Sequence, residues 1–346
     1  MILGHETTGT LNNARWNTAV GLTAMDAITE GDYNVAVGWD ALTGLTTASK
    51  NVAIGFGSIS GAVTGDENTA IGYNALQSNT DGTNNTAVGS GALDGNTTGD
   101  GNVGVGRKAG DGGNWNTAVG MMSLTSNNGD SNTAVGYMSM YTQTFGGMNN
   151  TALGYKCLTS NTKGALNTGV GRECLIENTT GDHNTAMGVE CLKENTTADD
   201  NSAFGLNALR LNTTGAQNVA VGLQAGNVNT TGSNITAIGY LALGNSGSGG
   251  SNSNSTVVGA EAGRYASGAN NSVLIGYQAG LNKGNDKQFS IAGIDITQPL
   301  YRAVFTAHPT FALKKEVSQA LVYDAVTEET SNPLEAFSSR ESISLM

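Results

Sequence analysis

A five-residue pattern of polar, small and branched apolar positions recurs along most of the chain. It reads Asn, Thr or Val, Ala, Val or Ile, Gly, as in residues 68–72. We number positions from this glycine, so that Asn stands at −4 and the branched residue at −1. Such alternation predicts a short β-strand with positions −3 and −1 on one face and positions −2 and 0 on the other. The closing glycines are Gly4, Gly21, Gly38, Gly55, Gly72, Gly89, Gly106, Gly120, Gly136, Gly154, Gly171, Gly188, Gly205, Gly222, Gly239, Gly259 and Gly276.

Most of these glycines are 17 residues apart, and the exceptions are spacings of 14, 16, 18 and 20. Position +3 is small, position +4 is mostly Leu, and position +7 is often an Asn that opens a turn, as in 96–99. A period of 17 leaves room for two strands of about five residues and two turns, and it is too short for a helical pair or a propeller blade. The sequence therefore predicts an all-β fold, a parallel β-solenoid or β-roll of about seventeen 17-residue coils over residues 1–286.

The two predicted strand faces differ in bulk. The −3 and −1 face is β-branched and is expected to be buried, whereas the alanine and glycine face is nearly flat. Short strands enclose little volume, and small residues allow two backbones to approach closely. We therefore expect the alanine face to pack against copies of the same chain, which makes the protein a homo-oligomer. Identical positions are expected to stack into ladders, with Asn side-chain amides paired along the axis.

The repeat resembles the left-handed parallel β-roll of trimeric autotransporter adhesin heads and the related repeats of phage tail fibres. Residues 68–75 and 271–280 carry this resemblance, together with the Asn-Thr-Thr-Gly turns. Residues 287–292, followed by Pro-Leu-Tyr at 299–301, are similar to the segment that often closes a tail-fibre roll.

This resemblance implies a homotrimer. It also implies a non-enzymatic structural and attachment protein, part of a phage tail fibre and so of the virion. The expected partner is a host cell-surface receptor, either a glycan or an outer-surface protein. A bacterial surface adhesin head is the alternative, with an extracellular location, and a polysaccharide depolymerase is a weaker one.

The chain changes character at Lys287. All three prolines and many of the large aromatic residues lie in residues 287–346. We expect a strand, a turn and a second strand over 291–305, and a short amphipathic helix over 314–327. The segment would cap the open edge of the solenoid, or serve as a trimerisation module or receptor-facing tip. The candidate receptor-binding residues are Tyr301, Phe305, His308 and Phe311.

Composition narrows the classes of function. The chain has 346 residues, of which 50 are glycine, and its net charge is −12 with no basic stripe. That charge argues against a nucleic-acid partner. No apolar run approaches the ~20 residues of a membrane helix, so we expect no membrane insertion. The first residues lack a basic region followed by an apolar stretch, so no secretory signal is expected.

Three cysteines occupy position +3 of consecutive coils, where most coils have Ala or Ser. We predict that Cys157, Cys174 and Cys191 are small buried hydrophobic residues. A metal-binding or disulfide-forming ladder is the alternative, although in-register side chains point in parallel and no histidine lies nearby by register.

Catalytic candidates are few. The three histidines are scattered, and the acidic residues sit in turns expected to be solvated, although a paired-carboxylate glycosidase site is conceivable. We therefore expect no catalytic residue, no cofactor and no metal. These residues are His5, His183, His308, Asp66, Glu67, Asp100, Asp182, Asp199 and Asp200.

Position +1 mixes aromatic and polar residues, which favours a rim or a subunit interface, with a carbohydrate-binding strip as the alternative. The Thr ladder at −3 raises the possibility of ice binding. Valines interrupt that ladder, and alternation puts Thr beside Val that we expect to be buried, so ice binding is disfavoured. The +1 residues are Trp39, Phe56, Tyr73, Ser90, Arg107, Tyr137, Tyr155, Arg172, Leu206, Tyr240 and Tyr277.

Overall fold

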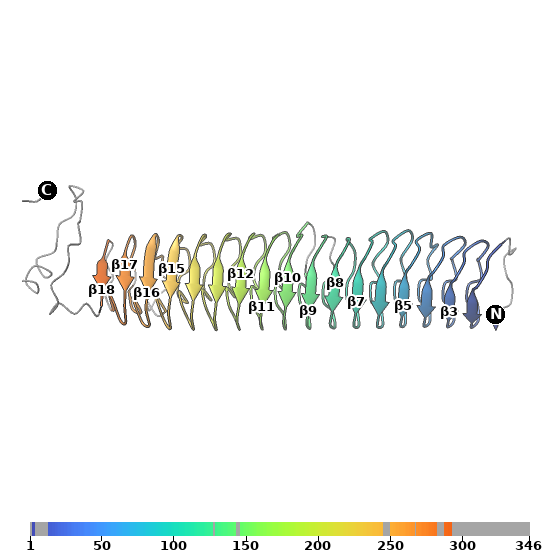
Figure 1. Ribbon diagram of the computed structural model, residues 1–346, viewed down its shortest axis with the longest axis horizontal. Coiled ribbons are helices and arrows are strands. Elements are labelled where there is room, and N and C mark those ends of the chain that lie inside the picture. Colours follow the sequence, from blue (N-terminus) through green and yellow to red (C-terminus); the bar gives the residue numbers. More distant parts are fainter. Residues whose placement is uncertain are drawn as a thin grey trace, which may run out of the picture. The chain divides into compact units, whose positions relative to one another are not determined.

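The computed structural model describes residues 2–3, 13–126, 129–142, 146–244, 250–266, 268–281 and 287–292. Its strands stand side by side in one row and form a single 18-stranded parallel sheet (Figure 1). Each strand pairs with the equivalent strand of the next coil and in the same register, so that Ala70 lies opposite Ala87. The predicted all-β parallel solenoid is confirmed.

The strands are three residues long in most coils. The last one, β18, lies beyond residue 286 and pairs with β17, so the ladder continues into the segment where we expected a cap. The bounds are β1 Ile2–Leu3, β2 Thr18–Val20, β3 Val35–Val37, β4 Val52–Ile54, β5 Thr69–Ile71, β6 Thr86–Val88, β7 Val103–Val105, β8 Thr117–Val119, β9 Thr133–Val135, β10 Thr151–Leu153, β11 Thr168–Val170, β12 Thr185–Met187, β13 Ser202–Phe204, β14 Val219–Val221, β15 Ile235–Ile238, β16 Ser255–Val258, β17 Val273–Ile275 and β18 Phe289–Ile291.

Each coil contains one strand, and the prediction of two strands of about five residues was wrong. The rest of the coil is built from turns. Residues at −5, +2 and +4 take left-handed backbone angles, as at Asn74 (φ 52°) and Leu76 (φ 51°). These reversals recur every few residues, so they leave no room for a second extended segment.

The interior of the coil is lined by the small residues. Ala70 at −2, Ala75 at +3 and Leu76 at +4 have no exposed surface, whereas Ile71 at −1 is 39% exposed. Our expectation that the alanine face packs against other subunits was therefore wrong, because the leucines of the same chain already cover it. A coil of 17 residues is narrow, and only a methyl group fits between the strand and the opposite turn. The bulkier branched side chains are left outside.

The glycine that closes the strand is required by contact between coils. Gly72 has φ +142°, and a Cβ atom placed on it would lie 2.5 Å from the carbonyl oxygen of Gly89. A side chain there would suffer both backbone strain and a clash with the next coil. The same contact recurs in other coils, for example between Gly188 and Gly205.

Asparagine at −4 forms a buried ladder along the axis. The Oδ1 atom of Asn184 accepts the backbone N–H of Asn201, one coil on, at 3.0 Å. Its Nδ2 atom donates to the carbonyl oxygen of Ala198 at 2.8 Å. One side chain thus satisfies a donor and an acceptor of the next coil where no strand pairing reaches.

Asparagine at +7 forms a second ladder, in which the amides pair as predicted. Asn195 donates from Nδ2 to Oδ1 of Asn178 at 2.8 Å and to the carbonyl oxygen of Ala198 at 3.1 Å. The oxygen of Ala198 therefore accepts one bond from each ladder, because Asn184 donates to it as well. The two ladders meet at the same turn, and this fixes the shape of the coil.

We expect Asn184→Ala to lower the free energy of unfolding by about 2–3 kcal/mol, because the buried N–H of Asn201 loses its acceptor. Asn184→Asp should cost more, since it keeps the acceptor but buries a charge and removes the donor. Guanidinium unfolding of the full chain measures both effects, with the exposed Thr197→Ala as a control that should stay within about 0.5 kcal/mol. Equal stability of Asn184→Ala and the parent chain would contradict a structural role for the ladder.

Candidate interaction surface

The outward face of the sheet is apolar along the solenoid. It presents position −3, which is Thr, Ser or Val, and position −1, which is a large apolar residue in each strand from β2 to β18. Because −2 points inward, −3 and −1 both point outward. We call this surface the outer sheet face. Its exposed −1 residues include Val20, Val37, Ile54, Ile71, Val105, Leu153, Met187, Phe204, Val221, Ile238, Ile275 and Ile291.

Position +1 widens the outer sheet face with a second apolar column. Its rings stack between coils: Phe56 and Tyr73 lie 5.4 Å apart between ring centroids, and Tyr137 and Tyr155 lie 5.5 Å apart. Rings stacked in register cover one another, so they present less of their flat faces than separate rings would. The exposed apolar +1 residues are Leu22, Trp39, Phe56, Tyr73, Met121, Tyr137, Tyr155, Val189, Leu206, Leu223, Tyr240 and Tyr277.

The outer sheet face is larger than a soluble monomer normally leaves exposed. Coils stacked at about 4.8 Å extend the two columns over roughly 80 Å. Contiguous apolar patches on monomers rarely exceed a few hundred Å², and larger ones mark interaction sites. Thr and Val lie side by side on this face, so the expected burial of Val does not count against ice binding. Val35 and Val52 still interrupt the Thr column.

Charged residues at the border of the outer sheet face are paired within the chain. The Arg172 Nη2 atom lies 3.1 Å from a carboxylate oxygen of Glu190. Arg210, which donates to the other oxygen at 2.9 Å, and Lys193 lie on the same carboxylate. The hydrogen bond from Arg210 lowers the pKa of Glu190, and the nearby cations act in the same direction.

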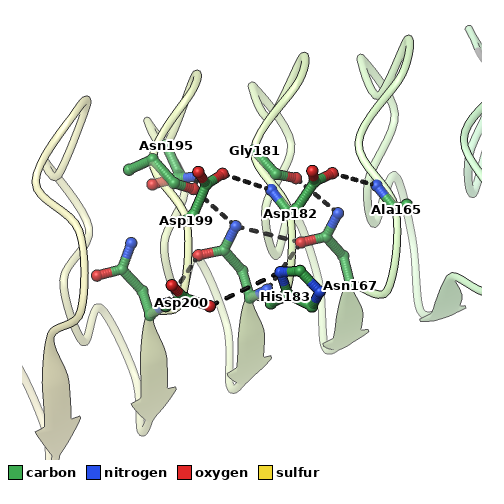
Figure 2. A network of polar contacts seen from close by, with 11 residues as sticks. Ala165, Asn167, Gly181, Asp182, His183, Asn195, Asp199 and Asp200 are labelled. Atoms are coloured by element: carbon green, nitrogen blue, oxygen red, sulfur yellow. Dashed lines mark hydrogen bonds and ion pairs between the residues drawn. The ribbon is translucent and has the colours of Figure 1, made fainter.

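The acidic residues of the turns cap backbone groups of the neighbouring coil (Figure 2). The Oδ1 atom of Asp182 accepts the N–H of Ala165 at 2.7 Å, and Asp199 accepts the N–H of Asp182 at 2.8 Å. Asp200 lies 3.7 Å from Nδ1 of His183. Asp182 and Asp199 each stabilise a turn, and both satisfy the same kind of donor one coil apart. The sequence placed these residues in turns but did not reveal this capping role.

The three cysteines lie in the interior, as predicted. Cys157, Cys174 and Cys191 have no exposed surface, and none forms a disulfide. Gly169 at −2 makes room for Cys157, since a Cβ atom on it would lie 2.5 Å from the sulfur. The hydrogen bond to Cys174 and burial both raise the pKa of Cys157, and the same causes raise the pKa of Cys191. In the residues that the structure describes, no group of three or more His, Cys, Asp or Glu side chains could hold a metal ion.

The four receptor-binding candidates lie outside the described residues, as do the strand pair and helix expected in the tail and two of the histidines. These residues are Tyr301, Phe305, His308, Phe311 and His5. Over the described ranges, no helix is long and apolar enough to cross a membrane. Comparison with known proteins found no family model and no curated protein that matches the chain.

Burial of the cysteines predicts that a thiol reagent such as Ellman's reagent will not react with the native chain and will react with all three thiols in guanidinium. Absorbance of the released thionitrobenzoate measures both values. Rapid reaction of any thiol in the folded chain would contradict the closed interior. Cys174→Ala serves as the control and should lower only the count in guanidinium, by one.

Proposed function

We propose that the chain is a structural fibre and attachment protein, a component of a phage tail fibre, whose solenoid assembles as a rigid homotrimer. The observation that carries the proposal is the outer sheet face, an exposed apolar surface that runs the length of the described coils. A stiff stack of short parallel strands suits a rod that holds a binding end away from its support. The resemblance of the repeat to tail-fibre and adhesin rolls supports the same role.

The outer sheet face favours association with copies of the same chain. Its apolar character persists from β2 to β18, so a partner must match it coil by coil, and an identical solenoid has the same spacing. Cyclic assembly closes such a surface without leaving an unpaired copy. The resemblance gives the number three, and the outer sheet face now supplies the contact that we had assigned to the alanine face.

We expect the purified chain to have a solution mass of about three times 35.2 kDa. Ile54→Asp combined with Ile71→Asp should convert it to smaller species, because each trimer would bury six added carboxylates. Light scattering coupled to size exclusion measures the mass, and circular dichroism reports whether the solenoid remains folded.

Ser78→Asp combined with Thr197→Asp is the matched control, since both residues are exposed and lie away from the outer sheet face. It should keep the parental mass. A folded parent chain that is a stable monomer, or a double Ile variant that keeps its full mass, would contradict assembly through the outer sheet face.

The attachment role predicts saturable binding of the labelled full chain to the surface of some bacterial strains in a panel. Tyr301→Ala combined with Phe311→Ala should weaken this binding at unchanged solution mass, whereas Thr197→Asp should not. Flow cytometry with excess unlabelled chain as competitor measures it. Lack of saturable binding across the panel would contradict the proposal, and binding to extracellular matrix proteins instead would favour the surface-adhesin alternative.

A further inference from the structure

One coil of the solenoid is shorter than the others. Gly106 and Gly120 are 14 residues apart, where most coils have 17. This coil also has glycine at three core positions: Gly104 at −2, Gly110 at +4 and Gly113 at +7. No other coil among the described residues has glycine at all three.

The buried apolar core divides at this coil. One group of packed side chains extends from Ala19 to Leu93, and the other begins at Ala109. Leu93 fills the space between them alone. A Cβ atom on Gly110 would lie 2.6 Å from its Cδ2 atom, and one on Gly104 would lie 2.8 Å from its Cγ atom. Across this interface one leucine contacts glycine backbone, where other coils stack Leu on Leu.

The second asparagine ladder also ends here. Asn96 donates from Nδ2 to Oδ1 of Asn79 at 3.1 Å and to the carbonyl oxygen of Gly99 at 3.0 Å. Its Oδ1 atom is buried and has no hydrogen-bond partner, because the equivalent position of the short coil is Gly113. Among the described residues the +7 ladder resumes at Asn161, which bonds to Asn178. An unsatisfied buried acceptor costs about 1–3 kcal/mol, which weakens this interface relative to its neighbours.

The strand side of the same interface is intact. Strand β7 pairs with β6 and with β8, and the −4 ladder continues from Asn85 through Asn102 to Asn116 with bonds of 2.9 Å. The deficit is thus confined to the turn side of the coil. An interface that is held at one edge and weak at the other can open about the held edge.

A carboxylate occupies part of the space left on the turn side. Asp111 lies against Gly95, and its Oδ2 atom accepts the N–H of Ser126 at 3.1 Å. Burial raises the pKa of Asp111, Asp94 acts in the same direction, and the Ser126 N–H and Lys108 oppose it. Because the ionised form is disfavoured in the closed coil, Asp111 adds little cohesion at neutral pH.

We propose that the short coil from Gly106 to Gly120 is a joint in the solenoid, the interface between coils that opens first, with the β6–β7–β8 strand edge as its hinge. The joint divides the described coils into two stacks that each keep their own core. Under load or thermal motion the solenoid bends or opens there and stays closed elsewhere.

Hydrogen exchange of the full-length native chain tests the joint. Peptides covering residues 103–120 should exchange at least about tenfold faster than peptides covering 168–188, where both ladders and the leucine stack are complete. The compared amides are alike, since Gly106 donates to Val88 and Gly188 donates to Val170, both at 2.8 Å. Equal or slower exchange over 103–120 would overturn the proposal.

Native trypsin digestion gives a second measure with a built-in control. Arg107 and Arg172 are both exposed and both occupy position +1, but only Arg107 lies in the joint. We expect cleavage after Arg107 or Lys108 to precede cleavage after Arg172 by at least about tenfold in rate. Preferential cleavage at Arg172 would overturn the proposal.

Repair of the coil provides the matched variant. Replacing residues 107–115 with the sequence of 206–217 adds three residues and supplies leucine at +4 and asparagine at +7. Exchange over the repaired coil should slow to the rate of its neighbours. If the repaired chain folds and this region still exchanges fast, the proposal is wrong; if it does not fold, the comparison within the parent chain decides.

Discussion

The structure depends on hydrogen bonds that run along the solenoid axis, from each coil to the next. Strand pairing supplies them over only three residues per coil in most coils, so the remaining buried backbone groups need other partners. Asparagine at −4 and +7 provides these partners, and both ladders meet at one turn carbonyl, such as that of Ala198. Glycine at 0 permits the close approach of coils that this bonding requires. The repeat is therefore conserved in form along the chain because each of its polar positions bonds to its own counterpart.

This constraint also determines what lies on the surface. A coil closed by such tight turns is narrow, and its interior accepts alanine, one leucine and little else. The branched and aromatic residues are left on the outer sheet face, where no residue of the same coil covers them. Assembly of several solenoids through that face follows from the shape of a single one. The attachment role follows from the rod that such assembly would make.

The period, the turn residues and the ladder positions were enough to predict the fold class, and the Ala-to-Cys substitutions at +3 were enough to predict buried thiols. The direction of the strand faces was predicted wrongly. Alternation separates two faces but does not say which one points inward. The volume of a 17-residue coil decides this: Ala70 fits inside and Ile71 does not. The weakness at Gly106–Gly120 could be anticipated from its spacing, but the unsatisfied Asn96 oxygen required the coordinates.

The central claim is that the outer sheet face joins copies of this chain, and distances between spin labels test it most directly. Ser90 is exposed at position +1, on the border of the face, and Ser78 is exposed on the turn side. Ser90→Cys and Ser78→Cys, each labelled with a nitroxide, report intermolecular distances by pulsed electron paramagnetic resonance. The account predicts dipolar coupling at both sites, with the shorter distances at residue 90. Absence of intermolecular coupling, or shorter distances at residue 78, would contradict it.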